Sequence, residues 1–69
     1  MGSAQRIKKL GEIMEQLEAA KVSLVKMLAE KSRDSYVGGT ELQKHCDAII
    51  ACEQLHQTLE VLQEFEATT

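Results

Sequence analysis

One interruption organises this chain of 69 residues: the segment 32–39, which ends in the adjacent glycines Gly38 and Gly39. Paired glycines preceded by Ser and Asp are a turn signal. On both sides of the segment, apolar residues recur at spacings of three and four, the period of an amphipathic helix. Two long helices joined by a short connection become antiparallel neighbours. The sequence therefore predicts an all-α fold, an antiparallel two-helix hairpin that forms one domain over residues 1–69.

The first helix is expected over about residues 4–32. Lys21 interrupts its main apolar row, and Gly11 weakens the helix by about 1 kcal/mol relative to Ala. The main row consists of Ile7, Leu10, Met14, Leu17, Leu24 and Leu28. A second row beside it consists of Ile13, Ala20 and Met27.

The turn is expected near residues 33–39 and the second helix over about residues 40–66. Thr40-Glu41-Leu42-Gln43 fits a capping box, in which the Thr hydroxyl accepts from the third helical N–H and the Gln side chain reaches back. The apolar residues of this helix do not stay on one side. One group consists of Leu42, Cys46 and Ile49, and a second, rotated group consists of Leu55, Leu59, Leu62 and Phe65.

Both helices carry a wider apolar arc than one neighbour covers. A helix that faces one partner needs a stripe about 100° wide, whereas the apolar residues of the first helix span roughly 160°. Exposed apolar surface of this size marks protein–protein sites, so we expect the hairpin to complete a helical bundle with a second copy or with a different protein. The alternative is a loosely packed hairpin whose lysine and glutamate stems shield the excess. The interface candidates, to be divided between core and interface, are Leu17, Leu24, Leu28, Leu55, Leu59 and Leu62.

The sequence predicts no catalytic, cofactor-binding or metal-binding residues. Cys52 and His56, at positions i and i+4, could share a metal ion, but His45 lies about 10 Å from them along the helix and cannot join the same site. His45 and Cys46 point about 100° apart, which argues against a thiol–base pair. Both cysteines are expected to be free, because six residues of helix separate them by about 9 Å. We therefore expect a binding protein and not an enzyme.

The charge pattern narrows the class of partner. The net charge is −3, from eight basic and eleven acidic residues, and sequence-independent nucleic-acid binding needs a basic surface. The one basic cluster is Arg6, Lys8 and Lys9, joined by Lys44 if the hairpin is tight. No segment is apolar enough to span a membrane, and two unbridged thiols indicate a reducing compartment. We expect a cytoplasmic protein with a protein partner, no cofactor, no membrane contact and little tendency to bind nucleic acid.

Three features of the layout are shared with a known family. The first helix has leucine-rich turns at Leu17-Glu18-Ala19-Ala20, Leu24 and Leu28; a glycine turn follows; and the second helix carries Ala51-Cys52-Glu53-Gln54-Leu55 and then Leu59, Val61 and Leu62. This layout resembles the small helical-hairpin co-chaperones of type III secretion systems. Where that family often has a Tyr-Gln pair entering the second helix, this chain has Leu42-Gln43. The resemblance implies a cytoplasmic two-helix chain that pairs with a helical-repeat chaperone, the two together holding the needle subunit unpolymerised.

Together, these observations favour a non-catalytic adaptor or co-chaperone that presents an apolar helical face to a partner protein, with type III secretion as the pathway suggested by the resemblance. The alternative is a self-associating regulator of phage or plasmid type. Such a protein would form a homodimeric four-helix bundle and act on a host factor or on RNA. A measurement of mass in solution separates the two hypotheses, because the second requires a dimer.

Overall fold

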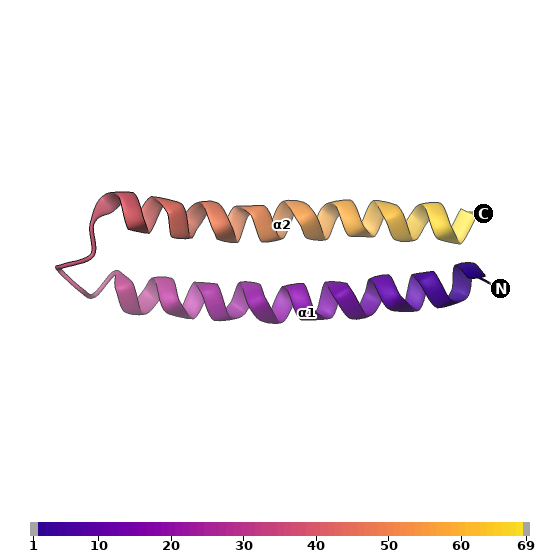
Figure 1. The fold of residues 1–69 in the computed structure, drawn as a ribbon, viewed down its shortest axis with the longest axis horizontal. Coiled ribbons are helices and arrows are strands. Elements are labelled where there is room, and N and C mark those ends of the chain that lie inside the picture. The colour runs from indigo at the N-terminus through magenta and orange to yellow at the C-terminus, as the bar shows by residue number, and fades with distance from the viewer. Residues whose placement is uncertain (1, 69) are drawn as a thin grey trace.

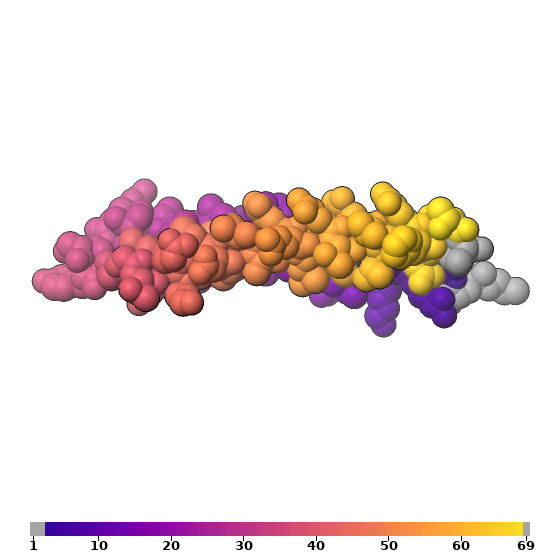
Figure 2. Space-filling model, turned by 90° about the horizontal axis from the view of Figure 1, so that it is seen from above, coloured from indigo at the N-terminus to yellow at the C-terminus, as the bar shows by residue number. Residues whose placement is uncertain are grey.

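The computed structural model describes residues 2–68, which form two helices, α1 (Gly2–Lys31) and α2 (Gly39–Thr68). The helices lie side by side in opposite directions, with the turn at one end and both termini at the other (Figure 1). The result is a rod with extents of 54 × 15 × 10 Å. Seen from the perpendicular direction, α2 lies over α1 along most of this rod (Figure 2). The predicted all-α hairpin is confirmed, and each helix begins and ends within two residues of its expected position.

The two helices meet along a line of residues that we call the seam. On α1 the half-buried residues alternate spacings of four and three, a 3.5-residue repeat typical of coiled-coil contacts. Lys21, which interrupts the apolar row in the sequence, keeps its place in this repeat. The α1 side of the seam consists of Ile7, Leu10, Met14, Leu17, Lys21, Leu24, Leu28 and Lys31.

On α2 the seam has the same repeat, but half of its positions are polar. His45 and Leu59 are the most completely buried residues among residues 3–68, with 7% and 8% of their surface exposed. The hairpin therefore has a very small core of its own. The α2 side of the seam consists of Leu42, His45, Ile49, Cys52, His56, Leu59, Gln63 and Glu66.

Ion pairs at three levels of the rod set the register of the two helices. The residue numbers of the two partners add to nearly the same value in all three pairs, as an antiparallel arrangement with a constant register requires. The N···O distances are short enough for direct contact, although each pair is partly exposed to solvent. The pairs are Arg6 with Glu66 at 3.4 Å, Lys21 with Glu53 at 3.2 Å and Lys31 with Glu41 at 3.3 Å.

Two polar side chains of α2 bind backbone carbonyls of α1. The His45 Nε2–H group donates to the Leu24 carbonyl, and Gln63 Nε2 donates to the Ile7 carbonyl at 3.1 Å. Since a carbonyl can only accept, His45 Nε2 carries the proton, and Nδ1 is left to accept from Lys31 Nζ at 3.3 Å. A shift of one helix along the other would break both contacts. These hydrogen bonds therefore specify the register from inside the seam.

Gly11 lies where Gln63 approaches α1. A Cβ atom at Gly11 would be 3.4 Å from Gln63 Nε2, which is within van der Waals contact. The Gln63 amide donates to the Ile7 carbonyl one turn earlier in α1, and a methyl group at Gly11 would touch the end of this side chain without a clash. The weak point of the first helix in the sequence thus coincides with the place where a polar side chain crosses the seam.

The turn forms as expected, but the predicted capping box at Thr40 is wrong. α2 begins at Gly39, and its first backbone hydrogen bond runs from Leu42 N–H to the Gly38 carbonyl at 3.2 Å. Gln43 does not reach back to the helix start, because its Nε2 donates to Asp47 Oδ1 at 3.0 Å, four residues further along α2. The helix therefore starts at the Gly38 carbonyl, and Gln43 is engaged within α2.

Candidate protein-binding surface

The six leucines predicted as interface candidates fall into two groups. Leu55 and Leu62 are 49% and 42% exposed and lie outside the seam. Side chains exposed to this extent contribute little to the packing of the hairpin itself. The other four lie in the seam: Leu17, Leu24, Leu28 and Leu59.

The exposed leucines belong to one side of the hairpin, which we call the apolar flank. Arg6 of α1 and Leu62 of α2 line the same open groove beside the seam. Residues seven apart share a side of a helix. The residues at seven-residue intervals from Arg6 in α1 and from Leu62 in α2 therefore lie on this side as well. The apolar flank consists of Ile13, Ala20 and Met27 of α1 with Ala48, Leu55 and Leu62 of α2.

All six positions of the apolar flank are apolar, and several are widely exposed. Ile13 is 39% exposed and Met27 is 46% exposed, close to the values for the two leucines. Sequence reasoning did not include Ile13 and Met27 among the interface candidates. The signal was present, however, because both belong to the second apolar row recognised in the first helix. An apolar row of this length on the outside of a protein marks a surface that another molecule covers.

The opposite side of the seam is acidic, and we call it the acidic flank. Glu18, Glu53 and Glu60 line one open groove there together with Lys21 and His56. The Glu53 carboxylate accepts a hydrogen bond from Lys21 Nζ and, with its charge, raises the pKa of Lys21. His56 Nδ1 lies 3.0 Å from Glu60 Oε1, its i+4 neighbour. The side chains of this flank are thus engaged with one another or with water.

A smaller apolar area lies on the acidic side, nearer the turn. Val25 follows Glu18 by seven residues and is 45% exposed. Ile50 precedes Gln57, which lines the acidic groove, by seven residues and is 49% exposed. Val22, three residues before Val25, is 44% exposed, so this area holds three large apolar side chains. The apolar flank holds four, together with two alanines, and is therefore the stronger candidate surface.

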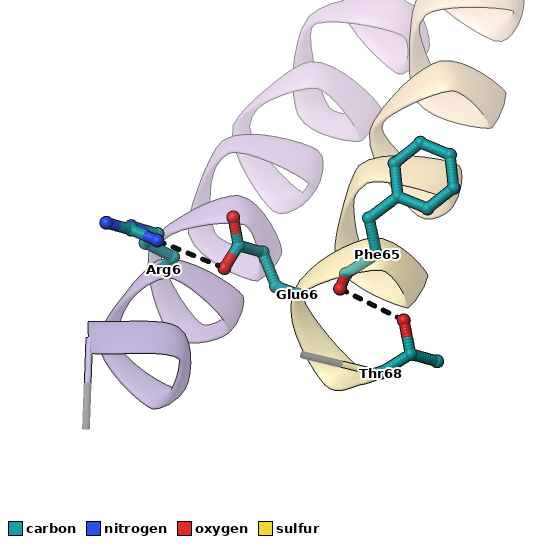
Figure 3. A network of polar contacts seen from close by, with 4 residues as sticks. All are labelled: Arg6, Phe65, Glu66 and Thr68. Atoms are coloured by element: carbon teal, nitrogen blue, oxygen red, sulfur yellow. Dashed lines mark hydrogen bonds and ion pairs between the residues drawn. The ribbon is translucent and has the colours of Figure 1, made fainter.

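The open end of the hairpin combines cationic and apolar groups. Arg6 pairs with Glu66 across the two helices, and Thr68 Oγ1 donates to the Phe65 carbonyl at 3.1 Å (Figure 3). The Phe65 ring points away from α1 and is 62% exposed. Lys9 lies beside this pair, in the groove that Arg6 and Leu62 line.

The cysteines and histidines considered for chemistry lie in or beside the seam. Cys46 and Cys52 are free, half-buried thiols. Cys52 and His56 line one groove, but within the described part of the chain no three His, Cys, Asp or Glu side chains come close enough to hold a metal ion. Both ring nitrogens of His45 are already in hydrogen bonds. The chemistry-bearing residues therefore take part in the packing and register of the hairpin.

The basic cluster does not form as expected. Arg6 and Lys9 lie at the open end of the rod, whereas Lys44 follows the turn by one helical turn and lies at the opposite end (Figure 1). The prediction that Lys44 joins the cluster is wrong, because the antiparallel register places it level with the last turns of α1. Of the remaining cations, Arg6 pairs with Glu66, and Lys8 and Lys9 are too few to make an extended basic surface for a phosphate backbone.

No protein-family model, curated protein or solved structure matches this chain significantly. Neither described helix contains a stretch that is both long and apolar enough to cross a bilayer. The function is therefore inferred from the surface of the hairpin.

Proposed function

We propose that this chain is a non-catalytic protein-binding module, an adaptor or co-chaperone whose apolar flank is the site of protein–protein contact. The observation that carries the proposal is the distribution of apolar side chains. Leu55 and Leu62 are turned out of the seam while His45, His56 and Gln63 are turned into it. A hairpin that is stable without a partner is expected to have leucine in the seam and polar residues on the outside.

The resemblance to type III secretion co-chaperones supplies one specific version of this proposal. In that version the apolar flank lies against a helical-repeat chaperone in the cytoplasm. Its support is the shared hairpin layout together with an apolar surface on the outside of both helices. In the other version, suggested by the alternative interpretation of the sequence, the molecule that covers the flank is a second copy of the chain.

Site-specific photo-crosslinking tests the proposal and captures the partner whatever its identity. A photoreactive phenylalanine analogue is placed at Leu55, on the apolar flank, or at Ile50, on the acidic side, in cells that naturally make the protein. The two positions are equally exposed, at 49%, so they differ in location and not in accessibility. We expect discrete adducts from position 55 only. Mass spectrometry of the adduct then separates a second copy from a different protein.

A variant on the same surface provides the matched control. Leu62→Gln should remove the adduct at position 55 while the helical circular dichroism signal is retained, because Leu62 is outside the seam. Equal labelling from positions 50 and 55, or an adduct at position 55 that persists in the Leu62 variant, would show that the apolar flank is not the binding surface.

A further inference from the structure

We propose that the apolar flank is occupied by a second copy of this chain, packed antiparallel about a two-fold axis that passes close to Ala20. The inference rests on the proposed function, since it names the partner of the same surface. It also predicts a specific geometry, a four-helix bundle in which α1 lies against α1 of the second copy and α2 against α2.

The first argument is the order of residues on the exposed side of α1. This row reads, from the open end toward the turn, as cation, large apolar, polar, small apolar, polar, large apolar and anion. Its centre is Ala20. A two-fold axis there places Ile13 opposite Met27, the polar Gln16 opposite the polar Ser23, and the charge at each end opposite the other sign in the second copy. The row consists of Lys9, Ile13, Gln16, Ala20, Ser23, Met27 and Glu30.

The charges at the two ends of this row suit an intermolecular contact. Lys9 and Glu30 are both exposed, and none of the ion pairs found within residues 2–68 uses either of them. They are 21 residues apart on one helix, which is about 32 Å along its axis, so they cannot meet within one chain. An antiparallel second copy brings Lys9 of each chain opposite Glu30 of the other. A parallel copy would place like charges together at both ends.

The second argument is the fit of large and small side chains on α2. Leu55 lies midway between Ala48 and Leu62. About a two-fold axis near Leu55, the exposed Leu62 of one copy faces Ala48 of the other, a pairing of large with small residues that allows close packing. The same two-fold axis places α2 of one copy along α2 of the other over the length of the apolar flank.

The centre of the α1 row, Ala20, and the centre of the α2 row, Leu55, lie at nearly the same level of the rod. Lys21 contacts Glu53 across the seam, so Ala20 is level with the region of α2 just before Leu55. The centres on α1 and α2 therefore fall within about one helical turn of each other, roughly 5 Å along the rod. One two-fold axis can thus satisfy both helices. Two rows with unrelated centres could not be matched by a single symmetric dimer.

The face of the rod that carries the apolar flank is also large enough for a dimer interface. One broad face of a rod measuring 54 × 15 × 10 Å has a projected area on the order of 800 Å², similar to the area each partner contributes to a standard protein–protein interface. The groove at the open end, lined by Gln5, Arg6, Lys9, Leu10, Leu62 and Glu66, is where Glu30 of the second copy would lie. Arg6 is paired with Glu66 there, so Lys9 is the cation that complements the Glu30 carboxylate.

Charge reversal tests the proposed contact directly. Sedimentation equilibrium of the purified chain should show a dimer. Lys9→Glu and Glu30→Lys should each weaken it by roughly threefold to thirtyfold, because each change removes two symmetry-related ion pairs and creates two repulsive ones. The double variant K9E/E30K should restore the affinity of the parent chain, since both contacts are then reversed together. Circular dichroism should show the same helical signal in all four proteins.

Cross-linking tests the direction of packing. In a background with Cys46→Ser and Cys52→Ser, Ala20→Cys lies on the proposed axis and should form a disulfide-linked dimer under mild oxidation. Lys9→Cys is the control, because the two copies of this position would lie about 30 Å apart. Failure of K9E/E30K to rescue, cross-linking of Lys9→Cys, or a parent chain that remains monomeric would each overturn the antiparallel dimer. The adduct formed at position 55 would still report separately on whether the flank binds another protein.

Discussion

The seam and the apolar flank run along the same length of the hairpin, but their composition is the reverse of what their positions suggest. The seam, which is partly buried, contains two lysines, two histidines, Gln63 and Glu66. The apolar flank, which faces mostly outward, contains only Ile, Leu, Met and Ala between the charged residues Arg6 and Glu41 at the ends of its two rows. Polar groups in a coiled-coil seam specify register and orientation at a cost in stability. The comparison indicates that the seam determines how the two helices pair and that the apolar flank serves contact with another molecule.

The difference between the two regions also explains why the hairpin has so small a core. Of residues 3–68, Leu59 and His45 alone are nearly inaccessible to solvent, and one of the two is polar. A chain of this size buries only about 60% of its unfolded surface even when it folds compactly. Covering the apolar flank adds buried apolar area at about 25 cal/mol per Å², without any change in the seam.

The sharpest way to test this comparison is to truncate one leucine from each region. Leu59→Ala should lower the free energy of unfolding by about 2–5 kcal/mol, because Leu59 is 8% exposed and the hairpin loses its best-packed side chain. Leu62→Ala, at 42% exposure, should change it by about 0.5 kcal/mol or less in dilute solution. Urea unfolding followed by circular dichroism at several protein concentrations measures both. Equal losses at the lowest concentration would remove the distinction between seam and flank.

A second test concerns the polar residues of the seam. His45→Ala should cost about 1–3 kcal/mol, because it removes a buried donor to the Leu24 carbonyl and leaves Lys31 Nζ without that acceptor. Gln43→Ala, on the exposed side of α2, is the matched control and should be close to neutral. Thermal unfolding compares the two variants with the parent chain. A neutral His45→Ala would mean that the hydrogen bonds of His45 do not contribute to the register, which the other contacts across the seam would then determine.

A third test asks whether the seam needs the space at Gly11. Gly11→Ala should stabilise the hairpin by about 0.5–1 kcal/mol through helix propensity, because the new methyl group would meet only the end of the flexible Gln63 side chain at 3.4 Å. Urea unfolding gives the change. Destabilisation that disappears in a Gln63→Ala background would show instead that the glycine is required for the hydrogen bond from Gln63 to Ile7.

The smallest expected effect is at the edge of the seam, where Lys21 pairs with Glu53. Glu53 raises the pKa of Lys21 above its ordinary value of 10.5, so the folded state binds this proton more tightly than the unfolded state. The pair therefore contributes its full stability below that value and loses it as the pH rises through the higher pKa of the folded protein. The contribution is modest because the pair is exposed to solvent.

Urea unfolding between about pH 8 and about pH 12 measures this loss as the difference between the parent chain and Lys21→Met. Taking the difference removes every effect of pH that the two proteins share. We expect the two curves to converge at the alkaline end. Curves that stay parallel throughout would show that Lys21 contributes through its aliphatic stem and not through its charge.

Most of the architecture follows from the sequence by itself. The spacing of apolar residues and the glycine pair at residues 38–39 are local signals, and local signals determine helices and breaks in helices. The surplus of apolar surface was also evident, because the width of an apolar arc can be obtained from residue spacing alone. The capping box at the start of α2 was predicted wrongly, since Gln43 has a competing hydrogen-bond partner in Asp47 on its own helix.

The tertiary structure decided which apolar row closes the hairpin and which remains outside. Each helix has two rows with helical spacing, and periodicity cannot rank them, because both satisfy it equally well. The choice depends on contacts between residues far apart in the sequence, such as Gln63 with Ile7 and Lys31 with Glu41. In the sequence His45 and Gln63 have the character of surface residues. Their role in the seam depends on helical carbonyls that only the folded hairpin brings within reach.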